Sequence, residues 1–174
     1  QGKTTTPTDL VKDLPGNNEA KAETIDNNLQ HEIVKKMSSN SVYYGKLSEM
    51  LKKIIMQRKI EAMSYEEYLR QVVELAEAIL HPETSGSYPD EVKDSAARRA
   101  LYDYFEQNVE LTIDVDGAIR VSIRPEWKRN FQKQQRIRLA VYQKLLLHNY
   151  TEDKATEETN NVFDIAQRQE EYDA

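Results

Sequence analysis

Two short runs of the sequence carry the residue types that a magnesium-dependent nuclease uses. Asp90 is followed by Glu91 and Lys93. Glu126 and Lys128 form a second Glu-x-Lys run. Nuclease chemistry needs such carboxylates on adjacent strands, where they converge on a metal ion that activates water. Neither run is surrounded by a strand pattern, so we interpret both as solvated loop residues.

Other arrangements that bind metals or nucleotides are incomplete. Asp114 and Asp116 resemble the start of a calcium loop, but the third acidic ligand and the bidentate Glu are missing. The three histidines, His31, His81 and His148, fall in separate predicted elements, and no two have the i, i+4 spacing of zinc ligands. The glycine-rich phosphate-binding loop is also missing. We therefore expect no catalytic residue, no cofactor and no metal in this chain.

One segment has the charge of a binding surface. Its residues are Arg124, Trp127, Lys128, Arg129, Lys133, Arg136 and Arg138. The whole chain has a net charge of -6, so this basic segment stands out locally and can contact DNA phosphates or an acidic partner surface. The alternative is a solvated helix face whose side chains pair at i, i+4 spacing.

Tyrosines are the other candidates for contact with a partner. Tyr43, Tyr44, Tyr65 and Tyr68 stand at helix-packing spacing within one strongly helical block. At that spacing they predict a core or the lining of a groove rather than base stacking. Those that are exposed would be good interface anchors, so these four form a possible docking face.

Composition predicts a helical protein. The 174 residues are 39% hydrophobic and 31% charged, with only 5 Gly and 5 Pro, and the mean hydropathy is -0.79. These values are typical of mainly α structure with large solvated faces. The absence of cysteine excludes disulfides and thiolate metal sites. No apolar run reaches the roughly 20 residues of a membrane span, and we expect a cytoplasmic protein.

The periodicity predicts three helices in the first half of the chain. Ile25, Leu29, Ile33 and Met37 recur every four residues, which indicates an amphipathic helix from Asn18 to about residue 40. A second helix runs from Ser41 to about Ile60, with a wide apolar stripe that needs burial on two sides. Its predicted stripe contains Tyr43, Tyr44, Leu47, Met50, Leu51, Ile54, Ile55 and Ile60.

A capping box begins the third helix. The Ser64 hydroxyl can accept from the Glu67 N–H while the Glu67 carboxylate returns to the Ser64 N–H. Because this box follows the second helix closely, the two helices should form an antiparallel hairpin. His81-Pro82 ends the third helix, and a surface loop is expected to about Asp94.

The second half predicts further helices and one ambiguous segment. We expect helices from Ser95 to Phe105, from Phe131 to His148 and over residues 155–171. Residues 110–123 alternate apolar and polar positions around Asp116-Gly117, which favours a small β-hairpin. A helix there would carry several β-branched residues and a mid-helix Gly, each unfavourable by roughly 0.5 to 1 kcal/mol.

The predicted fold class is therefore mainly α, a helical bundle built on an antiparallel helix hairpin. Residues 1–18 read as a linker or cloning remnant with a short apolar docking turn, and we expect the native chain to continue N-terminally. Residues 19–150 are expected to form the helical domain. Residues 151–174 are expected to form a polar C-terminal helix that docks weakly or frays.

Read in order, several runs resemble a known family. They are Leu14-Pro15-Gly16-Asn17, Glu19 to Asn28, Tyr43-Tyr44 with Leu47-Ser48, Ile54 to Glu61, Ser64-Tyr65-Glu66-Glu67-Tyr68-Leu69 and Ala97-Arg98-Arg99-Ala100-Leu101-Tyr102. This succession resembles the C-terminal region of the R (restriction) subunit of type I restriction-modification enzymes, over roughly residues 12–148.

Two stretches depart from the family pattern. The family often has Trp-Arg-Gly-Asn where this chain has Trp127-Lys128-Arg129-Asn130. The family stretch with an Asp-Glu-Ala-Ile core usually forms a helix, whereas this chain has Val115-Asp116-Gly117-Ala118-Ile119. The resemblance therefore favours a helix over residues 110–123 and the local pattern favours a hairpin, and the sequence leaves both open.

The resemblance implies a role in a larger enzyme. R subunits carry a nuclease and two ATPase motor domains that translocate and cut DNA, so ATP and Mg²⁺ would serve those domains only. The C-terminal helical region is thought to dock the motor onto the methyltransferase core of modification and specificity subunits. The expected partners are those subunits, and duplex DNA is the alternative through the basic segment.

Overall fold

The chain divides into two compact units, and each has its own core. A computed structural model of the chain describes Pro7, Val11 and residues 14–174. Unit 1 is Gln1–Ser87 and unit 2 is Tyr88–Ala174. The boundary falls within residues 19–150, which we expected to form one domain. Most of the linker predicted for residues 1–18 lies outside the described residues.

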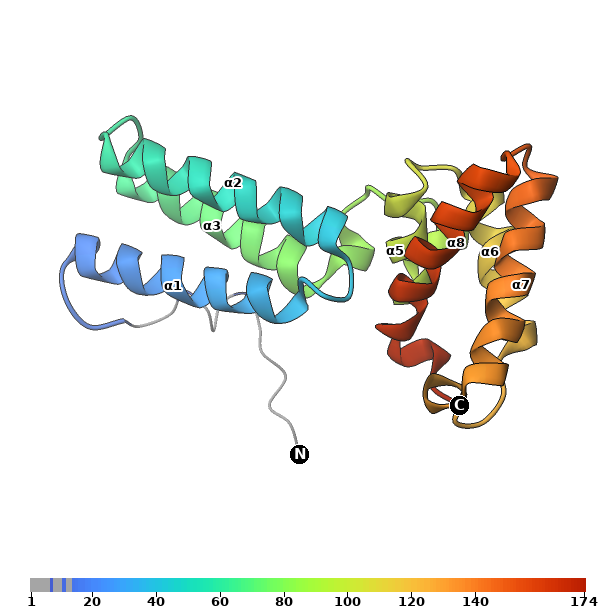
Figure 1. Cartoon of the computed structure of the whole chain (residues 1–174). Coiled ribbons are helices and arrows are strands. Elements are labelled where there is room, and N and C mark those ends of the chain that lie inside the picture. Colours follow the sequence, from blue (N-terminus) through green and yellow to red (C-terminus); the bar gives the residue numbers. More distant parts are fainter. Residues whose placement is uncertain (1–6, 8–10, 12–13) are drawn as a thin grey trace. The chain divides into compact units, whose positions relative to one another are not determined.

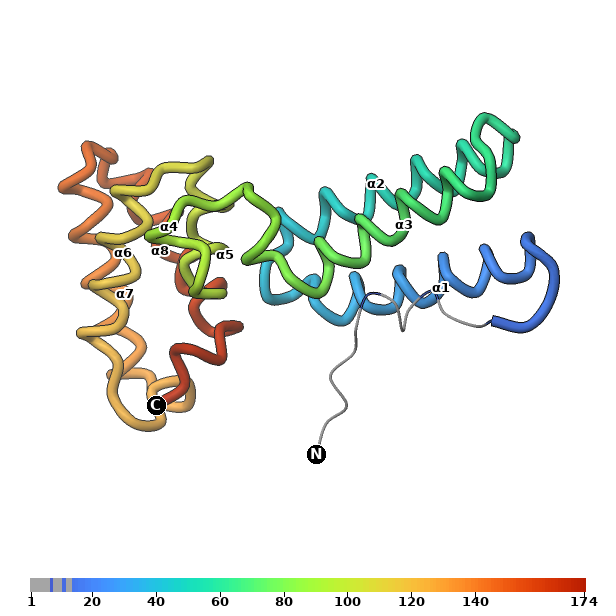
Figure 2. Tube along the Cα trace, turned by 180° about the vertical axis from the view of Figure 1, so that it is seen from behind, coloured from blue at the N-terminus to red at the C-terminus, as the bar shows by residue number. Residues whose placement is uncertain are grey.

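Unit 1 is built from three long helices. They are α1 (Asn18–Lys36), α2 (Ser41–Lys59) and α3 (Tyr65–Leu80), followed by the short 3₁₀ helix η2 (Pro82–Thr84). The predicted hairpin is confirmed, because the Tyr43 hydroxyl at the start of α2 donates to the Ala78 carbonyl near the end of α3, at 2.7 Å. In Figures 1 and 2, α1 runs alongside this pair.

Unit 2 is also helical. It contains α4 (Asp90–Lys93), α5 (Ala96–Tyr104), α6 (Val109–Ser122), η3 (Trp127–Arg129), α7 (Phe131–Leu147), α8 (Glu152–Gln167) and η4 (Glu170–Tyr172). Helix α7 packs against both α6 and α8 (Figures 1 and 2). The part of the chain that the structure describes contains no strand, so the mainly α prediction is confirmed.

Side chains cap the starts of the long helices. In each, an Asn, Ser or Thr accepts a hydrogen bond from a backbone N–H of the first turn, which satisfies a donor that the helix leaves unpaired. These caps are Asn17, Asn40, Ser64, Ser95, Asn108, Asn130 and Thr151. The capping box is only half formed, because the Glu67 carboxylate accepts from Arg70 and Gln71.

The ambiguous segment forms helix α6, and the local preference for a β-hairpin was wrong. Asn108 caps it, and Leu111, Val115 and Ile119 repeat every four residues along the buried stripe. A Cβ added at Gly117 would meet no atom within 4 Å, so this glycine faces open space. Burial of one helical stripe outweighs the unfavourable propensities.

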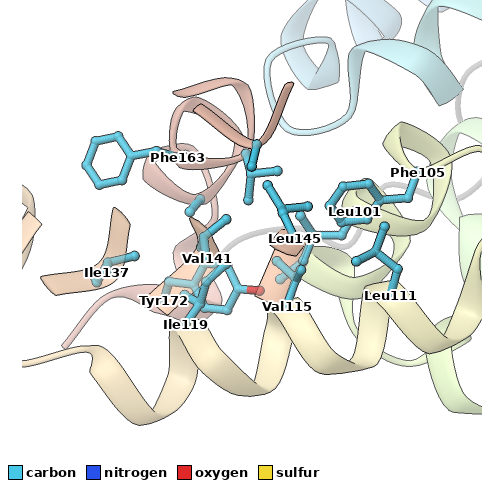
Figure 3. Packing of buried hydrophobic residues seen from close by; sticks show 14 of the residues in the cluster. Leu101, Phe105, Leu111, Val115, Ile119, Ile137, Val141, Leu145, Phe163 and Tyr172 are labelled. Carbon is cyan, nitrogen blue, oxygen red and sulfur yellow. The ribbon is translucent and has the colours of Figure 1, made fainter. Parts of the chain in front are cut away.

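The C-terminal helix is part of the unit 2 core, in contrast to the weakly docked or frayed helix that we expected. Val162 and Phe163 of α8 are buried, as is Tyr172 of η4. Figure 3 shows Phe163 and Tyr172 among apolar side chains of the other helices. The fully or nearly buried cluster contains Ala97, Leu101, Phe105, Leu111, Val115, Ile119, Trp127, Ile137, Val141, Leu145, Ala155, Val162, Phe163, Ala166 and Tyr172.

Candidate functional site

The indole of the basic segment is a core residue. Trp127 is 1% exposed and its ring lies 5.8 Å, centroid to centroid, from Phe163 in an edge-on arrangement. Its Nε1 donates to the Tyr172 carbonyl at 2.7 Å. Trp127 therefore joins η3 to the C-terminal segment, and it is not available to a partner as the sequence had suggested.

Several cations of the basic segment are held by their own unit. Lys128 forms an ion pair with Asp173 and donates to the Gln169 carbonyl. Arg138 lies over the Phe163 ring, 3.9 Å from its centroid, and contacts Asn160. These side chains tie η3 and α7 to the C-terminal elements of unit 2.

The remaining cations lie closer to solvent. Lys133 donates to the Pro125 carbonyl at 2.6 Å, and Arg124 donates to carbonyls of the preceding turn. Arg129 and Arg136 are exposed, and their guanidinium groups form no hydrogen bond or ion pair with any residue that the structure describes. Most side chains of the basic segment therefore have structural contacts within unit 2, and the guanidinium groups of Arg129 and Arg136 face solvent.

Helix α7 also exposes large apolar side chains along its length. Phe131 is 71% exposed, Leu139 57% and Leu147 73%. Helix α7 contains four basic residues and no acidic one. Helix α7 therefore presents both apolar and cationic side chains to solvent.

Three of the four candidate docking tyrosines are buried within unit 1. Tyr43 is 8% exposed, Tyr44 6% and Tyr68 0%, while Tyr65 is half-buried with its ring 6.0 Å, between centroids, from that of Tyr68. Burial of these three agrees with the core packing that their spacing predicted. These tyrosines do not form an exposed face.

Tyr68 belongs to a buried charged cluster that the sequence did not indicate. Its hydroxyl donates to Asp26 Oδ1 at 2.6 Å, and Arg58 Nη2 lies 2.7 Å from Asp26 Oδ2. Arg58 also pairs with Glu19. Burial raises the pKa of the Tyr68 hydroxyl, and the hydrogen bond to Asp26 adds to the effect. The cluster joins α1, α2 and α3.

A second buried cluster surrounds Asp116 in unit 2. Arg98 Nε lies 2.8 Å from Asp116 Oδ2, Arg120 Nε lies 2.9 Å from Oδ1, and the Tyr172 hydroxyl donates to Oδ1 at 2.6 Å. Arg120 also pairs with Glu171 at 2.8 Å. The cluster fixes the C-terminal segment to α5 and α6.

The two acidic residues of this cluster are held in their ionised forms. Burial raises the pKa of the Asp116 carboxyl, but hydrogen bonds from Tyr172, Arg120 and Arg98 outweigh burial and leave the pKa below its usual range. Burial likewise raises the pKa of Glu171, and hydrogen bonds that include those from Ser95 and Arg120 lower it overall. We did not predict this cluster from the sequence, because the alternating pattern places Asp116 in the turn of a β-hairpin.

The residues of the nuclease-like and calcium-like patterns do not converge on a common site among the described residues. Asp90 and Lys93 pair with each other at 2.7 Å within the four-residue helix α4. Asp114 lies 2.7 Å from the His148 Nε2 atom. Among the described residues, no group of three or more His, Cys, Asp or Glu side chains could hold a metal ion.

Comparisons with known proteins give no assignment. No protein-family model, no curated protein and no solved structure matches this chain. Within the described ranges, no helix is both long and apolar enough to cross a membrane. The resemblance to R subunits therefore remains a prediction from the sequence.

Proposed function

We propose that this chain is a non-catalytic helical assembly domain of a type I restriction enzyme R subunit. It docks the cytoplasmic motor subunit, which performs ATP-dependent DNA translocation and cleavage, onto the methyltransferase core. The observation that carries the proposal is the exposed apolar side chains of α7, since Phe131, Leu139 and Leu147 are each more than half exposed. Burial of such side chains stabilises a complex by roughly 1.5 to 3 kcal/mol each.

The proposal is tested by capture of the chain on a reconstituted methyltransferase core. Phe131→Asp with Leu139→Asp should weaken capture roughly tenfold or more, because charges replace apolar contacts at the interface. Val34→Asp is the matched control, since Val34 is 60% exposed on α1 of the other unit. Unimpaired capture of the double variant, or no capture of the native chain, would contradict docking through this face.

A second candidate function is contact with DNA, and one observation favours it. Arg129 and Arg136 have no ion-pair partner among the described residues, and α7 has no acidic side chain. Duplex DNA therefore serves as a parallel bait. Reversing both charges should reduce the salt slope of DNA binding by about 2, whereas Lys52→Glu with Lys59→Glu on α2 should not. An unchanged slope excludes this role.

A further inference from the structure

Unit 1 has a groove on its surface, and part of the apolar stripe of α2 lines it. It lies between α2 and α3, has a volume of about 370 Å³, and contains both apolar and charged side chains. Its lining residues are Met50, Lys53, Ile54, Gln57, Arg70, Gln71, Glu74, Leu75 and Ala78. Ile54 and Leu75 are buried and form the floor, whereas Met50 is 49% exposed at the rim.

The residue spacing of the groove suits a helix as its occupant. On α2 the lining positions Met50, Ile54 and Gln57 follow the i, i+4, i+7 spacing of one helix face. On α3, Gln71, Leu75 and Ala78 repeat this spacing. Two antiparallel helices with such facing rows leave a channel in which the apolar stripe of a third helix can pack.

The two helices that form the groove differ in charge. Helix α2 has five basic residues and one acidic residue, while α3 has four acidic residues and one basic residue. Lys53 lines the groove and is exposed, and the exposed Lys46 lies on the same face of α2 before the groove begins at Met50. On the α3 side, Arg70 pairs with Glu74, which also lines the groove, and with Glu67 about one turn before it, so these three side chains together carry net negative charge.

We infer that this groove binds an amphipathic helix of a partner subunit that has acidic side chains along one flank and basic side chains along the other. The acidic flank lies against α2 and the basic flank against α3. The carboxylates of α3 disfavour a nucleic acid backbone in the same place. The inference rests on the proposed role in assembly and names the chemistry of one partner element.

The charge pattern also fixes the direction of the bound helix. Turning a helix end for end on the groove exchanges its two flanks. A helix in the wrong direction would therefore place carboxylates against Glu67 and Glu74, and like charges would face each other along both walls.

The test uses the full chain and synthetic helical peptides of about 18 residues with one leucine stripe. One peptide has Glu on one flank and Lys on the other, a second has the flanks exchanged, and a third has both residue types mixed on both flanks. The first two should bind roughly tenfold more tightly than the third, because only they match both walls. Equal binding of all three would overturn the inference.

Direction is read from a spin label at the peptide N-terminus. The groove is lined on α2 from Met50 to Gln57, and the amides of Lys46 and Ile60 lie beyond its two ends, about 21 Å apart at 1.5 Å per residue. The first peptide should broaden one of these signals and the flank-exchanged peptide the other. Broadening of the same amide signal by both peptides would show that the charges of the groove do not set the direction of the bound helix, which would contradict the inference.

Matched variants place binding in the groove. Met50→Glu should weaken peptide binding roughly tenfold, whereas Met56→Glu should leave it unchanged, since Met56 is 58% exposed on the same helix and does not line the groove. Equal effects of the two variants would contradict the site. If the methyltransferase core captures the chain but no peptide binds, the helix-binding groove is refuted and the proposed function is not. If a peptide binds but the core does not capture the chain, the proposed function is refuted and the groove is not.

Discussion

At the residue scale, a few buried ionic side chains connect the helices within each unit. Asp116 is 0% exposed, yet it remains ionised because two guanidinium groups and one hydroxyl surround it. In unit 1, Asp26 is also buried and has one guanidinium partner, Arg58, and the hydroxyl of Tyr68. Breaking such a pair leaves an uncompensated buried charge, which costs more than the pair itself contributes.

Asp116→Asn should destabilise unit 2 by about 3 kcal/mol at pH 7, the lower end of the range for buried pairs because Arg98 and Arg120 remain partly exposed. The wild-type carboxyl has a folded-state pKa below its unfolded value of about 3.9. Its contribution is therefore present above that value and is lost as pH falls through the folded pKa. Urea titrations of both proteins between pH 7 and pH 2 measure this difference.

The control for this prediction is Asp164→Asn, which changes an exposed carboxylate of α8 and should alter the free energy of unfolding by less than about 0.5 kcal/mol. The stability difference between wild type and the Asp116 variant should narrow as the pH falls. A difference that stays constant down to pH 2 would show that the charge of Asp116 contributes nothing.

At the element scale, α6 shows how tertiary contacts override local preference. Its sequence alternates like a strand, but Leu111, Val115 and Ile119 also share one face of a helix. The core of unit 2 uses the helical face, and Asp116 meets Arg120 one turn later. Leu111 and Val115 would share a face in a strand as well, but only the helix continues that face to Ile119 past Asp116-Gly117 and brings Asp116 next to Arg120, so the buried cluster and the apolar stripe favour the helix together.

Gly117→Ala should stabilise unit 2 by roughly 0.5 to 1 kcal/mol, because alanine restricts the unfolded chain and favours the helix. The position has room for a Cβ. Gly86 is the matched contrast: its surroundings are equally open, but its φ of +71° is unfavourable for alanine. Gly86→Ala should therefore destabilise unit 1 by about 1 kcal/mol.

Thermal unfolding followed by circular dichroism measures both glycine variants. A decrease in melting temperature for Gly117→Ala would indicate that α6 is not a regular helix at this position. A stabilising Gly86→Ala would indicate that the turn before unit 2 adopts another backbone conformation.

At the scale of the whole molecule, the chain consists of two units with separate cores. Residues 1–87 and 88–174 are each compact. Each unit also contains its own buried cluster of a carboxylate, arginine and tyrosine. The proposed α7 surface belongs to unit 2 and the proposed groove belongs to unit 1.

Fragments 1–87 and 88–174 should therefore fold independently. Each should give a cooperative unfolding transition and dispersed NMR spectra, because neither loses a core contact of its own unit. The control is fragment 108–174, which lacks α5 and with it Leu101 and Arg98. It should be unfolded or molten, and a cooperative transition in that fragment would contradict this division of the core.

The sequence by itself determined the helical class and the long helices. Caps such as Ser64 and Ser95 and repeats such as Ile25 and Leu29 are local signals, because each lies within or next to the helix that it specifies. Tertiary structure alone decided the rest. Whether Trp127 is buried or exposed, whether residues 110–123 form a helix and where unit 2 begins all depend on partners distant in the chain. Burial of charge around Asp116 is of the same kind, because its partners lie up to 56 residues away and no local pattern encodes their meeting.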